Sequence, residues 1–328
     1  MALASPPAQV KGDTVPAIRS FAGLLAAACQ PPLVAIAIAG AEEVEVLQAA
    51  SSCCRLGLAR PILVGSERQA RALAEAHGLD LSGCELVHRE GPGAVAQATM
   101  DLVRAGQAQV AVKGFVSTTA FLHAALDRNA GLRGDWLVSH VGVFQVPGLE
   151  RLLSISDGGV VLHPSLAQKV EIIGNAVGVA RSLGIDRPRV ALVAGSDQVS
   201  VERPVTQEIA SLVAMRELWE SLGAWVDGPL TPDLAVDPAL ATAAGKAGPV
   251  AGRADVLVGP TVEATNTMCK AITYFAGGQM AGVVVGTRAP LALGSRSDPA
   301  ETRLACIAIG VLFAKRCQAM HPTKGEQF

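Results

Sequence analysis

Three places in the sequence bring charged, hydroxyl or amide side chains to the point where an apolar run gives way to a helical pattern. In open α/β sheets such junctions bind ligands, because free backbone N–H groups at the start of a helix attract anions. The first is VAVKGFVSTT, which begins at Val110, with Lys113 closing the expected strand. A phosphate group can bind the N–H groups near Thr118 with Lys113 beside it. A lysine that reaches solvent and a threonine that only caps the helix explain the residues equally well.

The second junction places Ser295 and Arg296 just before a helix start. Asp298 as cap, Pro299 at the first helical position and Glu301 three residues after the cap fully account for that start. They do not account for the arginine, whose forked guanidinium fits a phosphate group.

The third junction follows the expected strand that ends at Val258 and contains Asn266. An asparagine here can bind a ligand or cap the next helix, and the chemistry alone favours the cap slightly.

Other site types find little support. The glycine pairs do not form a dinucleotide fingerprint, the six histidines lack metal-ligand spacing, and no nucleophile elbow is present. We expect no bound metal. The seven cysteines show no paired spacing, and Cys53 and Cys54 are adjacent on a helical pattern. We therefore expect all seven to be reduced thiols, and the fold to depend on neither disulfide nor metal.

The elements that must position these residues are short apolar strands. Runs of this kind are Leu33–Ile38, Pro61–Val64, Val110–Val112, Val190–Val193, Asp255–Val258 and Gly282–Val285. Runs that are apolar on both faces are typical of parallel strands covered by helices. Apolar residues at helical spacing from Leu166 to Ala180, and from Val44 to Leu58, predict helices between them. Two extended segments between Trp136 and Ser156 predict a hairpin.

This alternation of strands and helices predicts an α/β fold with mostly parallel sheets. A length of 328 residues favours about two domains. The formal net charge of -2 provides no basic field for nucleic acid or for an anionic membrane, so we expect neither partner. The N-terminal residues show no signal pattern, and the most apolar run is far shorter than the ~20 residues of a membrane helix. We expect a cytoplasmic protein.

At these motifs the chain resembles the phosphate acetyltransferase and phosphate butyryltransferase family. The similar segments are VKGFVSTTAFLHAALDRNAGLR from Val112, SHVGVFQVPG from Ser139, DGPL from Asp227 and YFAGGQMAGVVVGTRAPLALGSRSDPAETRL from Tyr274. The last is the most specific, because order and spacing hold over roughly thirty residues. The hairpin and the lysine–glycine pair look closer to the butyryl branch.

The resemblance implies two α/β domains similar to those of isocitrate dehydrogenases, with the active site in the cleft between them. The first domain would comprise residues 1–138 and 292–328, and the second residues 139–291. The resemblance also implies a homodimer that needs no cofactor, since coenzyme A is a substrate. The implied reaction is the reversible transfer of an acyl group between coenzyme A and phosphate, without a covalent enzyme intermediate.

The resemblance further implies roles for individual residues. Arg296 matches the family's active-site arginine and Ser295 the serine beside it, and either Asp298 or Glu301 matches the carboxylate that helps to deprotonate the thiol. The substrates, namely acyl-CoA, phosphate and acyl phosphate, would be bound by Lys113, Thr118, Arg133, Ser139, Asp157, Asp233 and Asn266. The neighbouring Arg288 and Arg303 are expected to be less central.

Several positions depart from the family pattern. Val161 stands where asparagine is usual, Glu202 where lysine is usual, and the segment from Pro260 to Asn266 lacks the usual aspartate and glycine. These changes bear on acyl specificity and on activity itself. They leave two alternatives open: a non-catalytic homologue that binds coenzyme A or acyl-CoA, and a dehydrogenase on the same fold.

Overall fold

The computed structural model describes residues 16–134, 136–294 and 299–320. These residues form two compact units. The Lys113 unit comprises the described residues of Ser20–Val138 and Met280–Lys315, and the Asp157 unit those of Met1–Arg19, Ser139–Gln279 and Arg316–Phe328. The predicted domain boundaries themselves stay a prediction.

The Lys113 unit is built on a sheet with the strand order β3-β2-β1-β4-β11-β10. Its strands are β1 (Ala35–Ala39), β2 (Arg60–Gly65), β3 (Glu85–His88), β4 (Val110–Lys113), β10 (Gln279–Val285) and β11 (Leu291–Leu293). The neighbours from β3 to β11 run parallel, and only β10 is antiparallel to its partner β11. Every residue of β1 is buried, as expected for a central strand with helices on its faces.

The helices of this unit are α1 (Phe21–Ala28), α2 (Val44–Leu56), α3 (Glu67–Ala76), α4 (Pro92–Arg104), α5 (Thr118–Leu126) and most of α12 (Ala300–Met320). Helix α4 packs against β1, β2 and β4, while α2 and α3 pack against β2 and β3. The core consists largely of alanine, valine, isoleucine and leucine, whose small or branched side chains let these layers approach closely.

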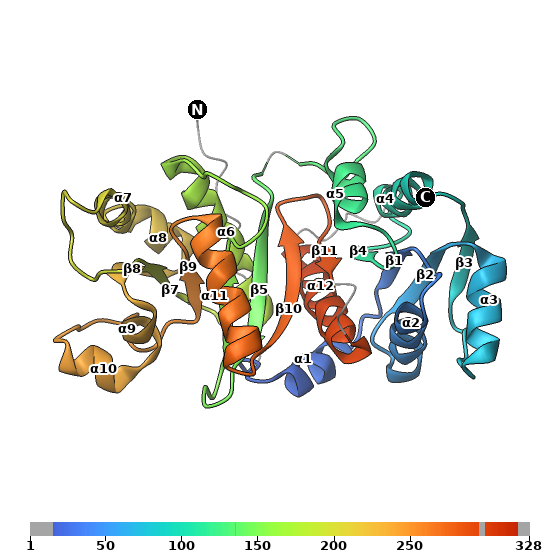
Figure 1. The fold of residues 1–328 in the computed structure, drawn as a ribbon, viewed down its shortest axis with the longest axis horizontal. Coiled ribbons are helices and arrows are strands. Elements are labelled where there is room, and N and C mark those ends of the chain that lie inside the picture. The colour runs from blue at the N-terminus through green and yellow to red at the C-terminus, as the bar shows by residue number, and fades with distance from the viewer. Residues whose placement is uncertain (1–15, 135, 295–298, 321–328) are drawn as a thin grey trace. The chain divides into compact units, whose positions relative to one another are not determined.

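The Asp157 unit has a sheet with the strand order β5-β6-β9-β7-β8. Its strands are β5 (Ser139–Gln145), β6 (Leu152–Ser156), β7 (Arg189–Val193), β8 (Trp225–Leu230) and β9 (Val256–Val258). Strands β5 and β6 form an antiparallel hairpin, and the other pairs are parallel (Figure 1). The helices are α6 (Leu166–Ser182), α7 (Pro204–Val213), α8 (Arg216–Leu222), α9 (Pro232–Val236), α10 (Pro238–Ala243) and α11 (Val262–Phe275). Helices α6 and α11 both pack against β6.

The α/β class predicted from the sequence is confirmed, as are the six predicted strands, the two helices and the hairpin. Observed strand ends lie within three residues of the predicted ones, and the differences arise because hydrogen-bond pairing and not apolarity sets where a strand begins. Among the described helices, none combines the length and the apolar character that crossing a membrane requires.

Candidate functional site

The junction between β4 and α5 holds Lys113 in a tight backbone turn. The turn is close to the end of β1: the N–H groups of Gly114 and Phe115 donate to the carbonyls of Ala39 (2.9 Å) and Gly40 (3.0 Å). A Cβ atom on Gly114 would lie 2.5 Å from the carbonyl oxygen of Gly40, so only glycine allows this approach. The close packing fixes where the lysine leaves the sheet.

The Lys113 side chain is only 4% exposed. Its ammonium donates to the carbonyl oxygens of Gly114 and Val116, each at 3.4 Å, so it stays inside the turn. The interpretation of a lysine that reaches solvent is therefore wrong. The threonine cap is wrong as well: the Oγ of Ser117 accepts the N–H of Ala120 at 3.1 Å, and Thr118 is the first residue of α5.

The pairing of β11 with β4 places Leu293, two residues before the second junction in the sequence, beside Lys113. Leu293, the last residue of β11, pairs with Lys113, and Arg296 follows three residues later in the sequence. Ser295, Arg296 and Asp298 lie outside the described residues, so their predicted roles stay predictions. Glu301 is exposed in the first turn of α12.

Arg303, on the next turn of α12, is a structural residue. Its guanidinium is buried and forms an ion pair with the carboxylate of Glu43 at 2.8 Å. Sequence reasoning did not detect this role, because Glu43 precedes α2 and is distant in the sequence.

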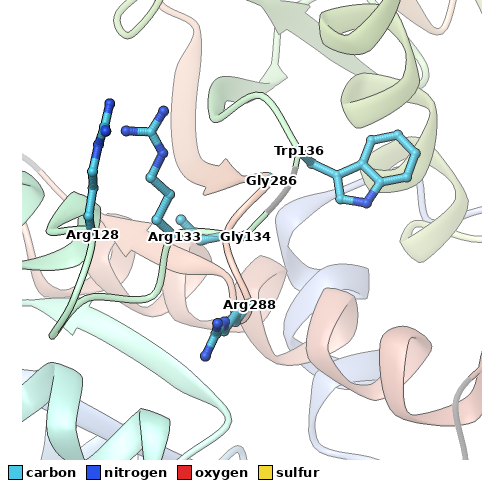
Figure 2. Close-up of a pocket in the computed structure, with 7 residues that line it drawn as sticks. Arg128, Arg133, Gly134, Trp136, Gly286 and Arg288 are labelled. Carbon is cyan, nitrogen blue, oxygen red and sulfur yellow. The ribbon is translucent and has the colours of Figure 1, made fainter. Parts of the chain in front are cut away.

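A cavity of about 520 Å³ lies in the Lys113 unit. It is lined by Arg128, Arg133, Gly134, Trp136, Gly286, Thr287 and Arg288. Figure 2 shows the side chains of Arg128 and Arg133 extending in the same direction, with Arg288 and Trp136 pointing to other sides of the backbone at Gly134 and Gly286. The four side chains are exposed.

The strand pairing separates Arg133 from Lys113. Arg133 forms a bridge with Thr287, in the turn between the end of β10 and the start of β11, whereas Lys113 pairs with the last residue of β11. The two predicted substrate-binding residues thus lie toward opposite ends of β11. A second cavity, of about 390 Å³, lies between α4 and α5 and is lined in part by Ser117, Thr119 and His123.

In the Asp157 unit, a turn after β6 is organised by the buried carboxylate of Asp157. The carboxylate accepts the backbone N–H groups of His140 (3.3 Å), Gly159 (2.9 Å), Val160 (3.2 Å) and Val161 (2.9 Å). Because its carboxylate oxygens accept these backbone hydrogen bonds, Asp157 stabilises the conformation of the turn. Only the backbone of Val161 takes part, so the valine at this position is compatible with the turn.

Asn266 does not cap a helix, which corrects the interpretation favoured from the sequence. Thr261 is the cap of α11, with its hydroxyl accepting the N–H of Ala264 at 3.3 Å, and Asn266 lies inside the helix. The side-chain amide of Asn266 donates to the carbonyl oxygen of Gly158 at 2.7 Å. The structure therefore places Asn266 beside the Asp157 turn, at the same edge of the sheet.

Two further predicted residues differ sharply in exposure. Ser139 is fully buried, and its hydroxyl accepts a hydrogen bond of 2.8 Å from the amide of Asn175 on α6. Asp233 is exposed in the first turn of α9, where a hydrogen bond from the Thr231 hydroxyl is the main cause that lowers the pKa of its carboxyl. Both residues lie at the edge of the sheet that carries Asp157: Ser139 starts β5 opposite the end of β6, and Asp233 follows the end of parallel β8.

His140, which sequence reasoning missed, sits next to this turn. Its Nδ1 is buried and makes no hydrogen bond with any described residue. Burial lowers the pKa of the imidazole, and the nearby Asp157 carboxylate only partly opposes this effect. The feature that could have pointed to His140 was its position next to Ser139, at the start of β5 and opposite the end of β6.

The seven cysteines are free thiols. The Sγ atoms of Cys54 and Cys84 lie 3.6 Å apart, and burial raises the pKa of Cys84 to about 12 with a further contribution from Cys54. Within the described residues, no cluster of three or more histidine, cysteine, aspartate or glutamate side chains could hold a metal ion.

Comparison with known proteins gives consistent matches over nearly the whole chain. A family model described as "Phosphate acetyl/butaryl transferase" matches residues 25–98 and 93–311. The chain is 37% identical to a phosphate butyryltransferase of Clostridium beijerinckii over 298 residues, which cover 91% of this chain and 99% of the relative. It is 36% identical to a phosphate acetyltransferase of Rhizobium meliloti, covering 90% and 93% of the two chains. A solved branched-chain phosphotransacylase from Enterococcus faecalis V583 superposes with a TM-score of 0.77 at 27% identity, covering 86% and 99%.

Proposed function

We propose that this chain, which belongs to the phosphate acetyl/butyryl transferase family, transfers an acyl group reversibly between coenzyme A and inorganic phosphate. The observation that carries the proposal is the 37% identity to a phosphate butyryltransferase over 99% of that relative's length. Acetyl and butyryl groups are the acyl groups to test first, since relatives with both names match equally well. The comparisons do not favour a non-catalytic homologue or a dehydrogenase.

The proposed reaction is a direct displacement. The thiolate sulfur of coenzyme A attacks the carbonyl carbon of the acyl phosphate, a carbon–sulfur bond forms, and the carbon–oxygen bond to phosphate breaks with its electron pair leaving on the phosphate. The proton of the thiol passes to a carboxylate, for which Asp298 and Glu301 are the candidates. Arg296 binds the phosphate, and the Ser295 hydroxyl donates to the oxyanion or to the leaving group. No covalent enzyme intermediate is formed.

Lys113 supports this proposal through its position. Its ammonium is held within the β4–α5 turn, and its strand neighbour Leu293 leads directly to Ser295 and Arg296. A buried cation here raises the local positive potential at which an anionic substrate binds. We assign Thr118, at the start of α5, to the same substrate-binding edge.

In the Asp157 unit the predicted residues divide by exposure. Asp157 and Ser139 act as positioning residues, because both are buried and already hydrogen-bonded. Asn266 and Asp233 are exposed and therefore available to a ligand. Arg133 is exposed as well, at the cavity that it lines, and is therefore available to a ligand.

The proposal also includes a homodimer in the cytoplasm that uses coenzyme A as a substrate and requires no separate cofactor. Free thiols at all seven cysteines are compatible with the reducing cytoplasm. Size-exclusion chromatography with light scattering tests the dimer directly.

Arg296→Ala provides the test of the function and of its main residue. We expect this variant to fold normally and to lose ~10²–10³-fold in turnover, because one transition-state partner of the phosphate is removed. Arg296→Lys should recover only part of the activity, since lysine lacks the guanidinium fork. The measurement is coenzyme A release from acetyl-CoA and butyryl-CoA in the presence of phosphate, with circular dichroism as the folding check.

Arg68→Ala is the matched control, because Arg68 is an exposed arginine on α3 that lines neither cavity. A folded Arg296→Ala variant with near wild-type turnover would remove this arginine from the mechanism. Wild-type protein without turnover on either acyl-CoA would contradict the proposed function.

A further inference from the structure

Two cysteines that are distant in the sequence meet at one side of the Lys113 unit. The Sγ atoms of Cys54, on α2, and Cys84, just before β3, lie 3.6 Å apart although the residues are 30 positions apart in the chain. Strand β3 stands at the end of the strand order of this sheet. Both side chains are half-buried, so a small solute can reach them. Neither residue has a role in the proposed acyl transfer.

The backbone before Cys84 is fitted to this contact. A Cβ atom on Gly83 would lie 3.0 Å from the Sγ of Cys54 and 3.1 Å from its Cβ, so the absence of a side chain lets the two segments approach this closely. The N–H of Cys84 donates to the carbonyl oxygen of Leu81 at 2.9 Å, which holds the cysteine in place. The packing of the native fold therefore brings the two sulfur atoms together.

The neighbouring Cys53 is in a different environment from Cys54. Cys53 is fully buried, and burial raises the pKa of its thiol. Consecutive residues of a helix point in different directions, so Cys53 lies in the core while Cys54 faces Cys84. A thiol buried among apolar side chains is inert toward solutes. The sulfur that can react with Cys54 is therefore that of Cys84.

We propose that Cys54 and Cys84 form a reversible disulfide when the protein is exposed to hydrogen peroxide. The sulfur of Cys54 attacks one peroxide oxygen, the oxygen–oxygen bond breaks, and the departing oxygen takes up the thiol proton and leaves as water. The sulfur of Cys84 then attacks the sulfur of the sulfenic acid so formed. A sulfur–sulfur bond forms, the sulfur–oxygen bond breaks, and a second water leaves with the proton of Cys84. The two thiols lose two electrons in total, and the peroxide gains them.

The order of the two steps follows from the surroundings of Cys84. Burial raises the pKa of the Cys84 thiol to about 12, with a further contribution from Cys54. Because the thiolate is the form that attacks a peroxide, Cys84 reacts slowly with peroxide itself and serves in the second step. That step is intramolecular, and the short distance between the sulfur atoms compensates for the small thiolate fraction. A disulfide that forms and is reduced again agrees with the free thiols of the structure.

Peptide mapping by mass spectrometry on the whole protein tests the proposal. The reduced protein is treated with hydrogen peroxide at a level that fully oxidises free glutathione in the same time, and remaining thiols are then blocked with iodoacetamide in denaturant. We expect two fewer blocked thiols than the seven of the reduced protein, and a peptide pair that joins Cys54 to Cys84. Dithiothreitol should restore all seven. The rate should rise with pH, because the thiolate fraction rises.

Single variants assign the two sulfur atoms. Cys84→Ser should abolish the cross-link and leave a sulfenic acid on Cys54 that dimedone traps. Cys54→Ser should abolish the cross-link and leave Cys84 with little dimedone adduct, since its thiolate fraction is small. Cys29→Ser is the matched control, because it removes another half-buried thiol of the same unit and should leave the cross-link intact. Circular dichroism checks that each variant is folded.

Three results would overturn the proposal. The first is a peroxide-treated wild type in which all seven cysteines are still blocked by iodoacetamide. The second is a cross-link that joins Cys54 to Cys53, and the third is a cross-link that persists in Cys84→Ser. None of these measurements requires turnover, so they decide the disulfide independently of the proposed acyl transfer.

Discussion

Arg303 and Arg288 belong to the same unit but occupy opposite surroundings. Arg303 is 4% exposed and paired with Glu43, whereas Arg288 is exposed in a cavity with two other arginines. A buried charge is retained only with a partner, because the loss of hydration costs more than an unpaired charge can recover. An exposed charge keeps its water until a ligand replaces it. We therefore interpret Arg303 as a structural residue and Arg288 as a residue that is accessible to a ligand.

The largest expected effect tests this contrast directly. Arg303→Met should lower the free energy of unfolding by about 3 kcal/mol, because it leaves the Glu43 carboxylate without its cation. Arg288→Gln should change it by less than about 0.5 kcal/mol. Urea unfolding followed by circular dichroism measures both.

The double variant Glu43→Leu/Arg303→Met is the control for the pair. Its loss of unfolding free energy should be smaller than the sum of the losses of the two single variants, since neither charge is then buried without its partner. Equal losses for Arg303→Met and Arg288→Gln would contradict the contrast between the two arginines.

Asp157 extends the contrast to a buried carboxylate that forms no ion pair with any residue the structure describes. Asp157→Asn should destabilise the protein by about 1–3 kcal/mol, because an amide offers one acceptor oxygen and turns an NH₂ group toward backbone donors. Asp233→Asn is the matched control, since Asp233 is an exposed aspartate of the same unit and should change stability by less than about 0.5 kcal/mol. Thermal unfolding of the two variants is the measurement. A tolerated Asp157→Asn would show that water replaces the lost hydrogen bonds.

The smallest expected effect is the pH dependence of stability that comes from His140. Burial lowers the pKa of the imidazole, so the folded chain holds this proton less tightly than the unfolded chain. Stability should therefore be complete above the unfolded pKa of about 6.5 and fall as the pH drops below it, by at most about 1.4 kcal/mol per pH unit. The measurement is urea unfolding between pH 5 and pH 8.

The variant His140→Gln should remove this slope. His163→Gln serves as its control, because His163 is an exposed histidine of the same unit. A slope between pH 5 and pH 6.5 that persists in His140→Gln would assign the proton to another group.

The strands and helices were predictable because local apolar patterning determines them. The run VAVK predicts β4, and apolar positions at helical spacing predict α6, as the structure has them. The caps were less predictable: Thr261 and not Asn266 caps α11, and Ser117 and not a threonine caps α5. Serine, threonine and asparagine are all good N-cap residues. Which of them caps the helix therefore depends on where the hydrogen-bond pairing of the preceding strand ends.

The sequence by itself determined the α/β class, the family and the junctions that carry Lys113, Arg296 and Asn266, because these depend on residues close together in the chain. Only the tertiary structure decided which distant residues meet. Arg303 joins Glu43 across roughly 260 positions, and the turn between β10 and β11 brings Arg288 beside Arg128 and Arg133. Strand register and helix packing set such contacts, and no local pattern encodes them.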